Sequence, residues 1–367
     1  MTIPKGWVSI DFKELEDLPC LRYAEKPDRS SSYRLLKEKV VDAGICSHCG
    51  TCTICPVDLI ILEDRPVDFD PKKGCMGCGV CVAVCPRYNY QPISGLGEYI
   101  EAVAGKSKRF VGQDGAMVSE FMATALEMGE IEVALFVARD EMFRPYVVHV
   151  RTPDELLDQR ITGTKYSYAN VMPELHRIIR RVDSVGIIGT PCMISGLRKL
   201  QEKVPLYKKK VKLAVGLFCT ENFYWHELYD FLKERGADLK NAVKTDIKKG
   251  NFIVTFKDGS EFTISVKEME EIVPSGCHVC QDFSAIEADV SVGSVGSKAG
   301  FSTVLIRSET AKKIYDYMLE KGYIETAEAK LNIVQKLCDF KVKIHPYNPK
   351  TEECEAEEGK AEEEKKE

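Results

Sequence analysis

The sequence predicts a mixed α/β protein of the α+β class, with a small cysteine-rich domain followed by a larger α/β domain. Eight of the fifteen cysteines fall between Cys46 and Cys85. Beyond about residue 93, short apolar runs suited to buried strands alternate with amphipathic segments of helical period. The chain has 367 residues, which is enough to bury more than one hydrophobic core.

The composition is typical of a soluble globular protein, with 44% hydrophobic and 29% charged residues. We expect no membrane span, because no apolar run is long enough to cross a bilayer. We expect no secretory signal, because the N-terminus lacks the apolar segment of a signal peptide. Thiols in this number favour a reducing, cytoplasmic compartment. The net charge is −6, and nine Glu and four Lys between Lys350 and Glu367 account for −5 of it. The remainder is nearly neutral, so nucleic-acid binding is not expected.

The periodicity of the larger domain predicts its elements in chain order. Helices are expected at 117–128, 171–181, 194–202, 223–235 and 309–320, and a further helix start at the capping box Thr152-Pro153-Asp154-Glu155. Strands are expected at 131–138, 184–189, 212–218, 289–292 and 303–307, with a hairpin at 251–266 turning at Asp258-Gly259. Strands that alternate with helices indicate a parallel or mixed sheet.

The cysteines between Cys46 and Cys85 have the spacing of a bacterial two-cluster ferredoxin, in which a fourth Cys followed by Pro binds the other cluster. On this pattern two [4Fe–4S] clusters have the ligand sets Cys46, Cys49, Cys52 and Cys85, and Cys75, Cys78, Cys81 and Cys55. Only two residues separate Cys52 from Cys55, where three are usual, so the exchange through Cys55 stays open. A disulfide framework and structural zinc fit these spacings less well.

Four more cysteines lie next to turns of the larger domain: Cys192, Cys219, Cys277 and Cys280. Cys192 and Cys219 each follow a predicted strand, so both are expected at one edge of a parallel sheet. The four thiols are suited to a third [4Fe–4S] cluster; the alternative is that one or two of them are buried core residues. Cys20, Cys338 and Cys354 are not expected to bind metal.

Several polar segments are suited to a flavin or another anionic cofactor. Asp114-Gly115 directly precedes a predicted helix, so its N–H donors and the positive end of the helix can face an anion. The Gly/Ser segment 293–300 follows a strand, and its backbone N–H groups could approach a pyrophosphate. Thr162, Lys165 and Tyr166 provide a hydroxyl, a charge and an aromatic face. Ordinary polar turns have the same composition. No Gly-x-Gly-x-x-Gly follows a strand, so NAD is not indicated.

Six ordered motifs resemble the beta subunit of the coenzyme F420-reducing hydrogenases and its formate and reduced-coenzyme dehydrogenase relatives. The motifs are Asp114–Ser119, Gly163–Tyr166, Gly189–Cys192, Gly216–Phe223, Gly276–Cys280 and Ala288–Gly296. The resemblance covers roughly residues 105–325. A two-cluster domain placed before the flavin domain is similar in layout to the input subunit of the dehydrogenases that oxidise reduced coenzyme F420.

The resemblance implies FAD, coenzyme F420 (an 8-hydroxy-5-deazaflavin) as substrate, and a [4Fe–4S] cluster on the second group of cysteines. It implies hydride exchange between F420 and FAD, and single-electron transfer to or from partner subunits of a dehydrogenase, hydrogenase, formate dehydrogenase or heterodisulfide reductase complex. The alternative is a non-catalytic electron-transfer subunit. The expected cofactor residues are Asp114, Gly115, Ser119, Thr162, Gly163, Thr164, Lys165, Tyr166, Asn222, Gly293, Ser294, Gly296 and Ser297, with Arg160, Lys165 or Lys298 pairing with the acidic tail of the coenzyme.

These predictions divide the chain into four parts. They are an N-terminal extension (1–40), a two-cluster ferredoxin-like domain (41–92), an FAD- and deazaflavin-binding domain with a third cluster (93–349), and a disordered acidic tail (350–367). The expected location is the cytoplasm, either free or on the cytoplasmic face of a membrane complex.

Overall fold

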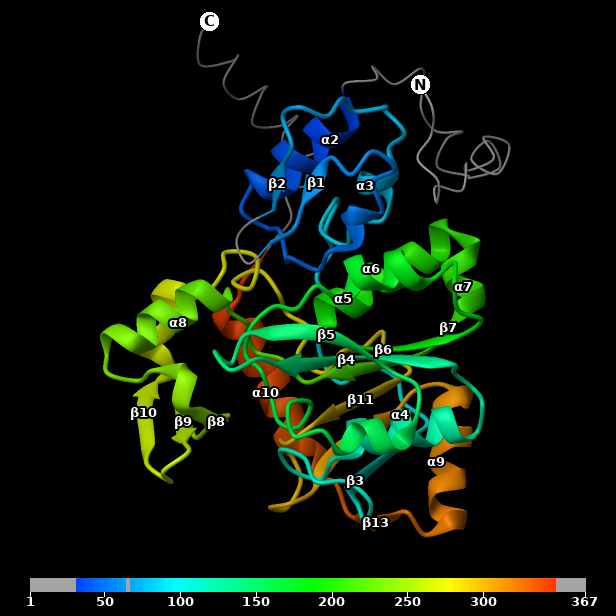
Figure 1. The fold of residues 1–367 in the computed structure, drawn as a ribbon, viewed down its shortest axis with the longest axis vertical. Helices are drawn as coiled ribbons and strands as arrows, with labels where there is room; N and C mark the ends of the chain where they lie inside the picture. Colours follow the sequence, from blue (N-terminus) through cyan, green and yellow to red (C-terminus); the bar gives the residue numbers. More distant parts are fainter. Residues whose placement is uncertain (1–30, 64–66, 348–367) are drawn as a thin grey trace, which may run out of the picture.

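The computed structural model describes residues 31–63 and 67–347 (Figure 1). Most of the N-terminal extension and the acidic tail, with Cys20 and Cys354, lie outside the described residues. Among the described residues the fold is mixed α/β, with a small cysteine-rich domain above a larger α/β domain, which confirms the predicted fold class.

The larger domain is built on one eight-stranded mixed sheet. Four adjacent strands of this sheet are parallel to one another: β11, β7, β6 and β4. The strands on either side of these four, β12 and β5, pair with them antiparallel. In spatial order the strands are β13 (Ile324–Ala327), β3 (Glu101–Ser107), β12 (Ser302–Ile306), β11 (Val290–Gly293), β7 (Val211–Leu217), β6 (Val185–Gly189), β4 (Val133–Arg139) and β5 (Pro145–Val150). The parallel pairing of β6 and β7 brings their carboxyl ends, and the cysteines that follow them, to the same edge of the sheet.

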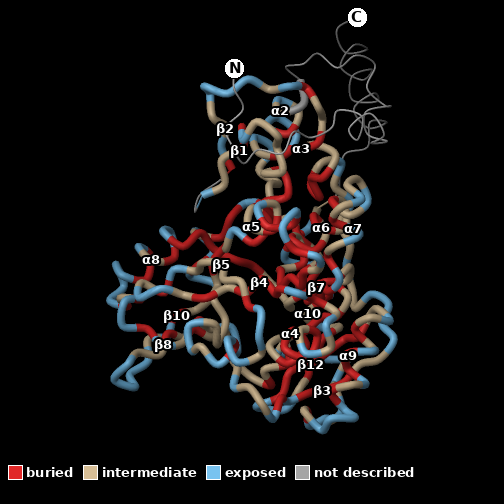
Figure 2. The backbone as a smooth tube through the Cα atoms, turned by 45° about the vertical axis from the view of Figure 1, so that its right-hand side comes forward, coloured by how far each residue is buried: buried red, intermediate tan, exposed pale blue. Residues whose placement is uncertain are grey.

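Helices cover both faces of this sheet (Figure 1). One face packs against α4 (Met117–Glu127) and α9 (Glu309–Lys321). The other packs against α5 (Val171–Ile178), α6 (Pro191–Lys203) and α7 (Pro205–Lys210). Apolar side chains recur every three or four residues in α4, and those of Met117, Phe121 and Met122 are fully buried. The buried segments in Figure 2 are concentrated along β4, β7 and β12.

A side lobe and a C-terminal helix complete the domain. The lobe contains α8 (Trp225–Glu234), the short 3₁₀-helices Leu239–Asn241 and Val266–Ile272, and the antiparallel sheet of β8 (Ala242–Lys248), β9 (Asn251–Phe256) and β10 (Glu261–Ser265). The last helix, α10 (Leu331–Ile344), buries Val334 and Cys338 against Phe283. Cys338 therefore lies in an apolar cluster.

The cysteine-rich domain has little regular structure of its own. Its elements are α2 (Ser31–Leu36), the π-helix Lys37–Val41, the 3₁₀-helix Thr51–Ile54, β1 (Ile60–Ile61), β2 (Asp68–Phe69) and α3 (Val80–Ala83). It sits on α5 and α6 (Figure 1). The contact is close: His176 of α5 bonds the carbonyl oxygen of Thr51 at 3.2 Å, and a Cβ on Gly196 of α6 would lie 2.7 Å from Thr51 Cγ2.

The predicted elements of the larger domain are found with small shifts at their ends, apart from the one expected at Thr152. There the structure has only a 3₁₀ turn, Pro153–Leu157, and the Thr152 side chain does not cap it. The turn stays short because the chain becomes extended at Asp158 and returns to the end of β4, where Arg139 N–H donates to Arg160 O. Periodicity did not predict β3, β5, β8, β13, α7 or α10.

Candidate iron–sulfur and cofactor site

The eight N-terminal cysteines separate into two groups. The thiol of Cys46 interacts electrostatically with those of Cys49 and Cys85, and Cys52 interacts with all three. The thiols of Cys78 and Cys81 interact instead with Cys55 and Cys75, and these four line one cavity. We call Cys46, Cys49 and Cys52 with their loop the first motif, and Cys75, Cys78 and Cys81 with theirs the second motif. The structure brings Cys55 to the second motif and Cys85 to the first, as the ferredoxin ligand pattern requires.

Burial makes these thiols poor acids in the absence of metal. It raises the pKa of Cys46 to about 12 and that of Cys85 to about 11, and the neighbouring thiols act in the same direction. A buried group of thiols is stable as thiolates only when a cation replaces their protons. Among the described residues, no three Cys, His, Asp or Glu side chains are placed to hold one metal ion. The ligands of a four-iron cubane lie further apart than those of a single ion.

The third group of cysteines lies at the carboxyl edge of the parallel strands. Cys192 is at the start of α6 after β6, Cys219 follows β7, and Cys277 and Cys280 lie in the loop before Asp282. All four line one cavity, and the thiol of Cys219 interacts with those of the other three. Four thiols from three separate segments thus converge, and Cys192 and Cys219 meet at one edge of the sheet, as predicted from their positions after strands.

Two cations also reach this cavity. The side chain of Arg87 lines it, and its Nη1 has no hydrogen-bond partner among the described residues. Lys341 of α10 donates to the carbonyl oxygen of Cys219 at 2.7 Å and lies 3.6 Å from Cys280 Sγ. Burial alone would raise the pKa of Cys280, but the charges of Lys341 and Arg87 lower it. A buried, unpartnered donor beside four thiols fits an anionic thiolate cluster, because sulfur can accept its hydrogen bond.

The three groups of cysteines are contiguous in space. Cys192 Sγ lies 3.8 Å from the carbonyl oxygen of Ser47, which belongs to the first motif. A Cβ on Gly276 would lie 1.9 Å from the carbonyl oxygen of Cys46, so the two cysteine loops meet backbone to backbone. The thiol of Cys52 interacts with that of Cys81. The spatial order is therefore the third group, the first motif, and then the second motif.

Part of the predicted cofactor set comes together at one place, where the side lobe meets the large sheet. Gln113 Nε2 donates to the carbonyl oxygen of Thr245 at 3.1 Å, and Thr245 Oγ1 donates to that of Thr164 at 2.9 Å. Asp114, half-buried, interacts with Asp246, and burial followed by this carboxylate raises the pKa of Asp114. We call the segments 113–114, 162–166 and 245–246 the lobe cluster.

The lobe cluster adjoins the third cysteine group. The phenol of Tyr166 interacts with Asp246 and with the thiol of Cys219. Two residues further on, the hydroxyl of Tyr168 lies 3.5 Å from Cys277 Sγ. The segment 164–168 thus connects the predicted cofactor residues with the cysteine cavity.

Polar atoms in and beside the lobe cluster are suited to a bound cofactor. Gln113 Oε1 and Arg139 Nε are buried without a hydrogen-bond partner among the described residues. A Cβ on Gly163 would lie 3.5 Å from Gln113 Oε1. The amino group of Lys165 donates to the carbonyl oxygens of Ile161 and Thr162, and burial, followed by the charge of Arg139, lowers its pKa to about 7. The acceptor on Gln113 and the donor on Arg139, both buried and without a partner among the described residues, fit a polar ligand such as FAD.

Other predicted cofactor residues have structural contacts. The Gly115 N–H donates to Ser302 Oγ at 3.0 Å, and a Cβ there would lie 2.1 Å from the carbonyl oxygen of Gly105. Contrary to our expectation, this amide is therefore used within the protein, because the backbones of residues 105 and 115 lie in contact. Ser119 lies half-buried on α4.

The Gly/Ser segment also bonds internally. Ser297 Oγ donates to the carbonyl oxygens of Ser294 and Phe301, Gly293 packs on Phe218, and Gly296 takes a φ of +90° beside α10. Asn222 lines the cysteine cavity, where its carbonyl oxygen lies 4.0 Å from Cys277 Sγ.

Arg160 and Lys298, candidates for the acidic tail of the coenzyme, already have partners. Arg160 forms an exposed ion pair with Asp158, and Lys298 lies over the ring of Phe301. Sequence reasoning missed Arg87 and Lys341 altogether. Arg87 follows Cys85-Pro86 directly, and this position was the one available signal. Nothing in the sequence of α10 distinguishes Lys341 from the exposed lysines near it.

Three sequence profiles match consecutive parts of the chain. The "4Fe-4S dicluster domain" profile matches residues 38–86. The other two describe the two ends of the "Coenzyme F420 hydrogenase/dehydrogenase, beta subunit". The profile of its N-terminal part matches residues 100–176, and the profile of its C-terminal part matches residues 182–331.

Three relatives extend the similarity. The coenzyme F420-dependent sulfite reductase of Methanocaldococcus jannaschii is 34% identical over 85% of this chain; the match spans only 51% of that relative. The subunit designated F in the F(420)H(2) dehydrogenase of Methanosarcina mazei is 29% identical over 83% of this chain and 91% of its own. The beta subunit of the coenzyme F420 hydrogenase of Methanothermobacter thermautotrophicus is 35% identical over 63% of this chain and 85% of its own.

A chain of the F420-reducing [NiFe] hydrogenase complex from Methanosarcina barkeri has the same fold. The TM-score is 0.64 at 30% identity, covering 70% of this chain and 92% of that one. Cysteine motifs of the dicluster type beside a three-layered α/β domain define an iron–sulfur protein of the oxidoreductase class. The chain belongs to the family of coenzyme F420 hydrogenase/dehydrogenase beta subunits, as the six motifs indicated. No helix within the described ranges is long and apolar enough to cross a membrane.

Proposed function

We propose that the protein exchanges hydride between coenzyme F420 and FAD and passes single electrons through three [4Fe–4S] clusters to or from a partner redox subunit. The observation that carries this proposal is the contiguity of the lobe cluster with three successive groups of four cysteines. When bound, FAD would supply the step between two-electron hydride chemistry and one-electron cluster chemistry. The names of the relatives support F420 as the substrate.

The residues have separate tasks in this proposal. Gln113 and Arg139 offer an unpaired acceptor and donor for FAD. Lys165 offers a charge for an acidic group of the coenzyme. The third cysteine group holds the cluster next to the flavin, because Tyr166 and Tyr168 connect the lobe cluster with the cysteine cavity. The remaining cysteines hold two clusters of the dicluster domain.

The second motif is the outlet toward the partner. Its cavity is lined by Met76, which is 44% exposed, and by Cys75 and Cys78, both of them partly accessible. The group of Cys46, Cys49, Cys52 and Cys85 is more enclosed, because the last three of these cysteines are buried. An electron that leaves through the most accessible group crosses the shortest distance to another protein.

The test is composition followed by kinetics on protein purified without oxygen. We expect about twelve irons and one FAD per chain. Reduced F420 should bleach the flavin band rapidly in a stopped-flow instrument, and NADH should not. Rapid bleaching by NADH alone would refute the choice of substrate. Absence of flavin absorbance after iron is chelated would favour a non-catalytic electron-transfer subunit.

A further inference from the structure

Two buried cations from distant parts of the chain flank the third cysteine group. Arg87 comes from the cysteine-rich domain, directly after Cys85-Pro86, and is 2% exposed. Lys341 comes from α10 and is 1% exposed. Burying either charge costs several kcal/mol unless an anion compensates for it. Their common neighbour is the cysteine cavity, which both residues line.

The ammonium group of Lys341 is held in place by the backbone. It donates to the carbonyl oxygens of Cys219 at 2.7 Å and of Asp282 at 2.8 Å, and lies 3.6 Å from Cys280 Sγ. The two carbonyl groups fix the position of the charge but do not neutralise it. Asp282 is the adjacent buried carboxyl group, and its oxygens accept from the Ile286 N–H. It also interacts electrostatically with Lys341, less strongly than the thiols of Cys280, Cys219 and Cys277 do.

Arg87 interacts with two cysteine groups through different atoms. Its backbone N–H donates to Cys85 Sγ of the first group at 3.4 Å. Its guanidinium lies over the ring of Tyr90, interacts with the thiols of Cys192 and Cys280, and has an unpartnered Nη1 among the described atoms. Substituting the side chain therefore removes the charge at the third group and leaves the bond to Cys85 intact.

We propose that Arg87 and Lys341 are positioning residues that stabilise the reduced state of the third cluster and so raise its reduction potential. This inference rests on the third cluster of the proposed function. Reduction of a cluster adds one electron and hence one negative charge, and cluster potentials depend on local charge, hydrogen bonds to sulfur and burial. In a buried site of low effective dielectric, two fixed positive charges favour the more negative state. The third cluster would then readily accept electrons from the flavin.

The test is a redox titration followed by EPR on anaerobic full-length protein. Cys192→Ser identifies the signal of the third cluster as the one that it abolishes. We expect Lys341→Met to lower the midpoint potential of that signal and to leave the other two unchanged. Arg87→Gln should lower it as well, with a smaller shift of the cluster held by Cys46, because the Arg87 charge also acts on that thiol. Lys341→Arg and Arg87→Lys keep the positive charge, so the midpoint potential of the third cluster should be close to that of the wild type in both. Lys343→Met, on an exposed position of the same helix, is the matched control.

Each outcome decides one of the two proposals. About eight irons in the wild type, with no signal lost in Cys192→Ser, would remove the third cluster and the inference with it. About twelve irons with an unchanged third potential in both charge-removing variants would overturn the inference and leave the cluster standing. Loss of the cluster in Lys341→Met that Lys341→Arg restores would support a role of the charge. Loss in both would assign Lys341 to packing and refute the inference for this residue.

Discussion

At the scale of single residues, Lys165 is the cation that we propose to bind an acidic group of the coenzyme. Burial and Arg139 lower its pKa to about 7. The amine is charged below this pH and neutral above it, so affinity for the anionic coenzyme should fall as pH rises through about 7. Losing one charge-assisted contact costs roughly 1.5–3 kcal/mol, or about ten- to a hundredfold in affinity.

Lys165→Met should therefore weaken F420 binding at pH 6 by about that factor and flatten its pH dependence. Titration calorimetry at pH 6 and pH 8 measures both effects. Lys298→Met is the control, because Lys298 is exposed over the ring of Phe301. Unchanged affinity at pH 6, with FAD content also unchanged, would exclude Lys165 from both cofactor sites.

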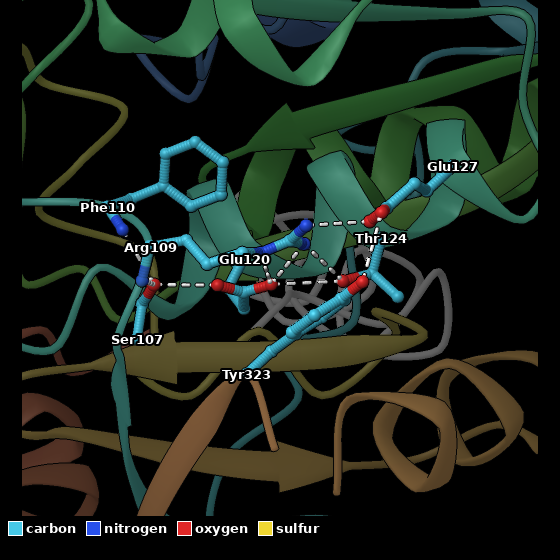
Figure 3. Close-up of polar contacts among 7 residues, drawn as sticks. All are labelled: Ser107, Arg109, Phe110, Glu120, Thr124, Glu127 and Tyr323. Carbon is cyan, nitrogen blue, oxygen red and sulfur yellow. Dashed lines mark hydrogen bonds and ion pairs between the residues drawn. The ribbon is translucent and has the colours of Figure 1, made fainter. Parts of the chain in front are cut away.

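At the scale of elements, Arg109 connects α4 with the segment that follows β3 and with Tyr323, which directly precedes β13 (Figure 3). Arg109 pairs with Glu120, whose side chain is fully buried, and also with Glu127. Ser107 Oγ donates to Glu120, and the Arg109 guanidinium lies 3.6 Å from the centre of the Tyr323 ring. Arg109 is the cation that pairs with the buried Glu120 carboxylate. The loss of Arg109 would therefore leave this carboxylate without its counter-charge.

Arg109→Met should destabilise the protein by about 3–5 kcal/mol and lower its melting temperature by roughly ten degrees. Thermal unfolding of anaerobic protein measures the shift. Arg151→Met is the control, because its ion pair with Glu132 is exposed and should contribute about 1 kcal/mol or less. Equal melting temperatures for the two variants would show that the Arg109 pair contributes little net stability.

At the scale of the whole molecule, the two domains should carry separable steps. Cys78→Ala should destroy one N-terminal cluster and leave reduction of the flavin by reduced F420 intact, because Cys78 lies in the cysteine group furthest along the spatial order from the lobe cluster. Iron analysis and a single-turnover stopped-flow trace measure the two steps. Loss of flavin reduction in a folded variant would contradict the proposed order of centres.

The contact between the domains depends on Gly276. A Cβ there would overlap the carbonyl oxygen of Cys46, a backbone atom that cannot rotate away. Gly276→Ala should therefore push the two cysteine loops apart and slow electron transfer from the reduced flavin to the N-terminal clusters, with flavin reduction preserved. Gly74→Ala, where no atom lies within 4 Å of the added Cβ, is the control. Equal cluster reduction rates in both variants would refute a strict requirement for this contact.

The sequence by itself determined what depends on local spacing. The motif at Cys75–Cys85 has the ferredoxin spacing within a few residues, and the 3.6-residue apolar period of α4 needs no distant partner to be recognised. Elements without such a local signal were missed. β3 combines charged residues with small ones, and α10 carries exposed apolar residues on the face opposite Cys338.

Only the tertiary structure decided which distant groups meet. The third cysteine group depends on the parallel register of β6 and β7, and Arg87 and Lys341 reach it from positions 254 residues apart in the chain. The Gly115 N–H was predicted to face an anion, but close packing against Gly105 directs it to Ser302. The reason is physical: sequence spacing fixes neighbours within a turn or a loop, whereas the partners of a buried charge or amide depend on how separate elements pack.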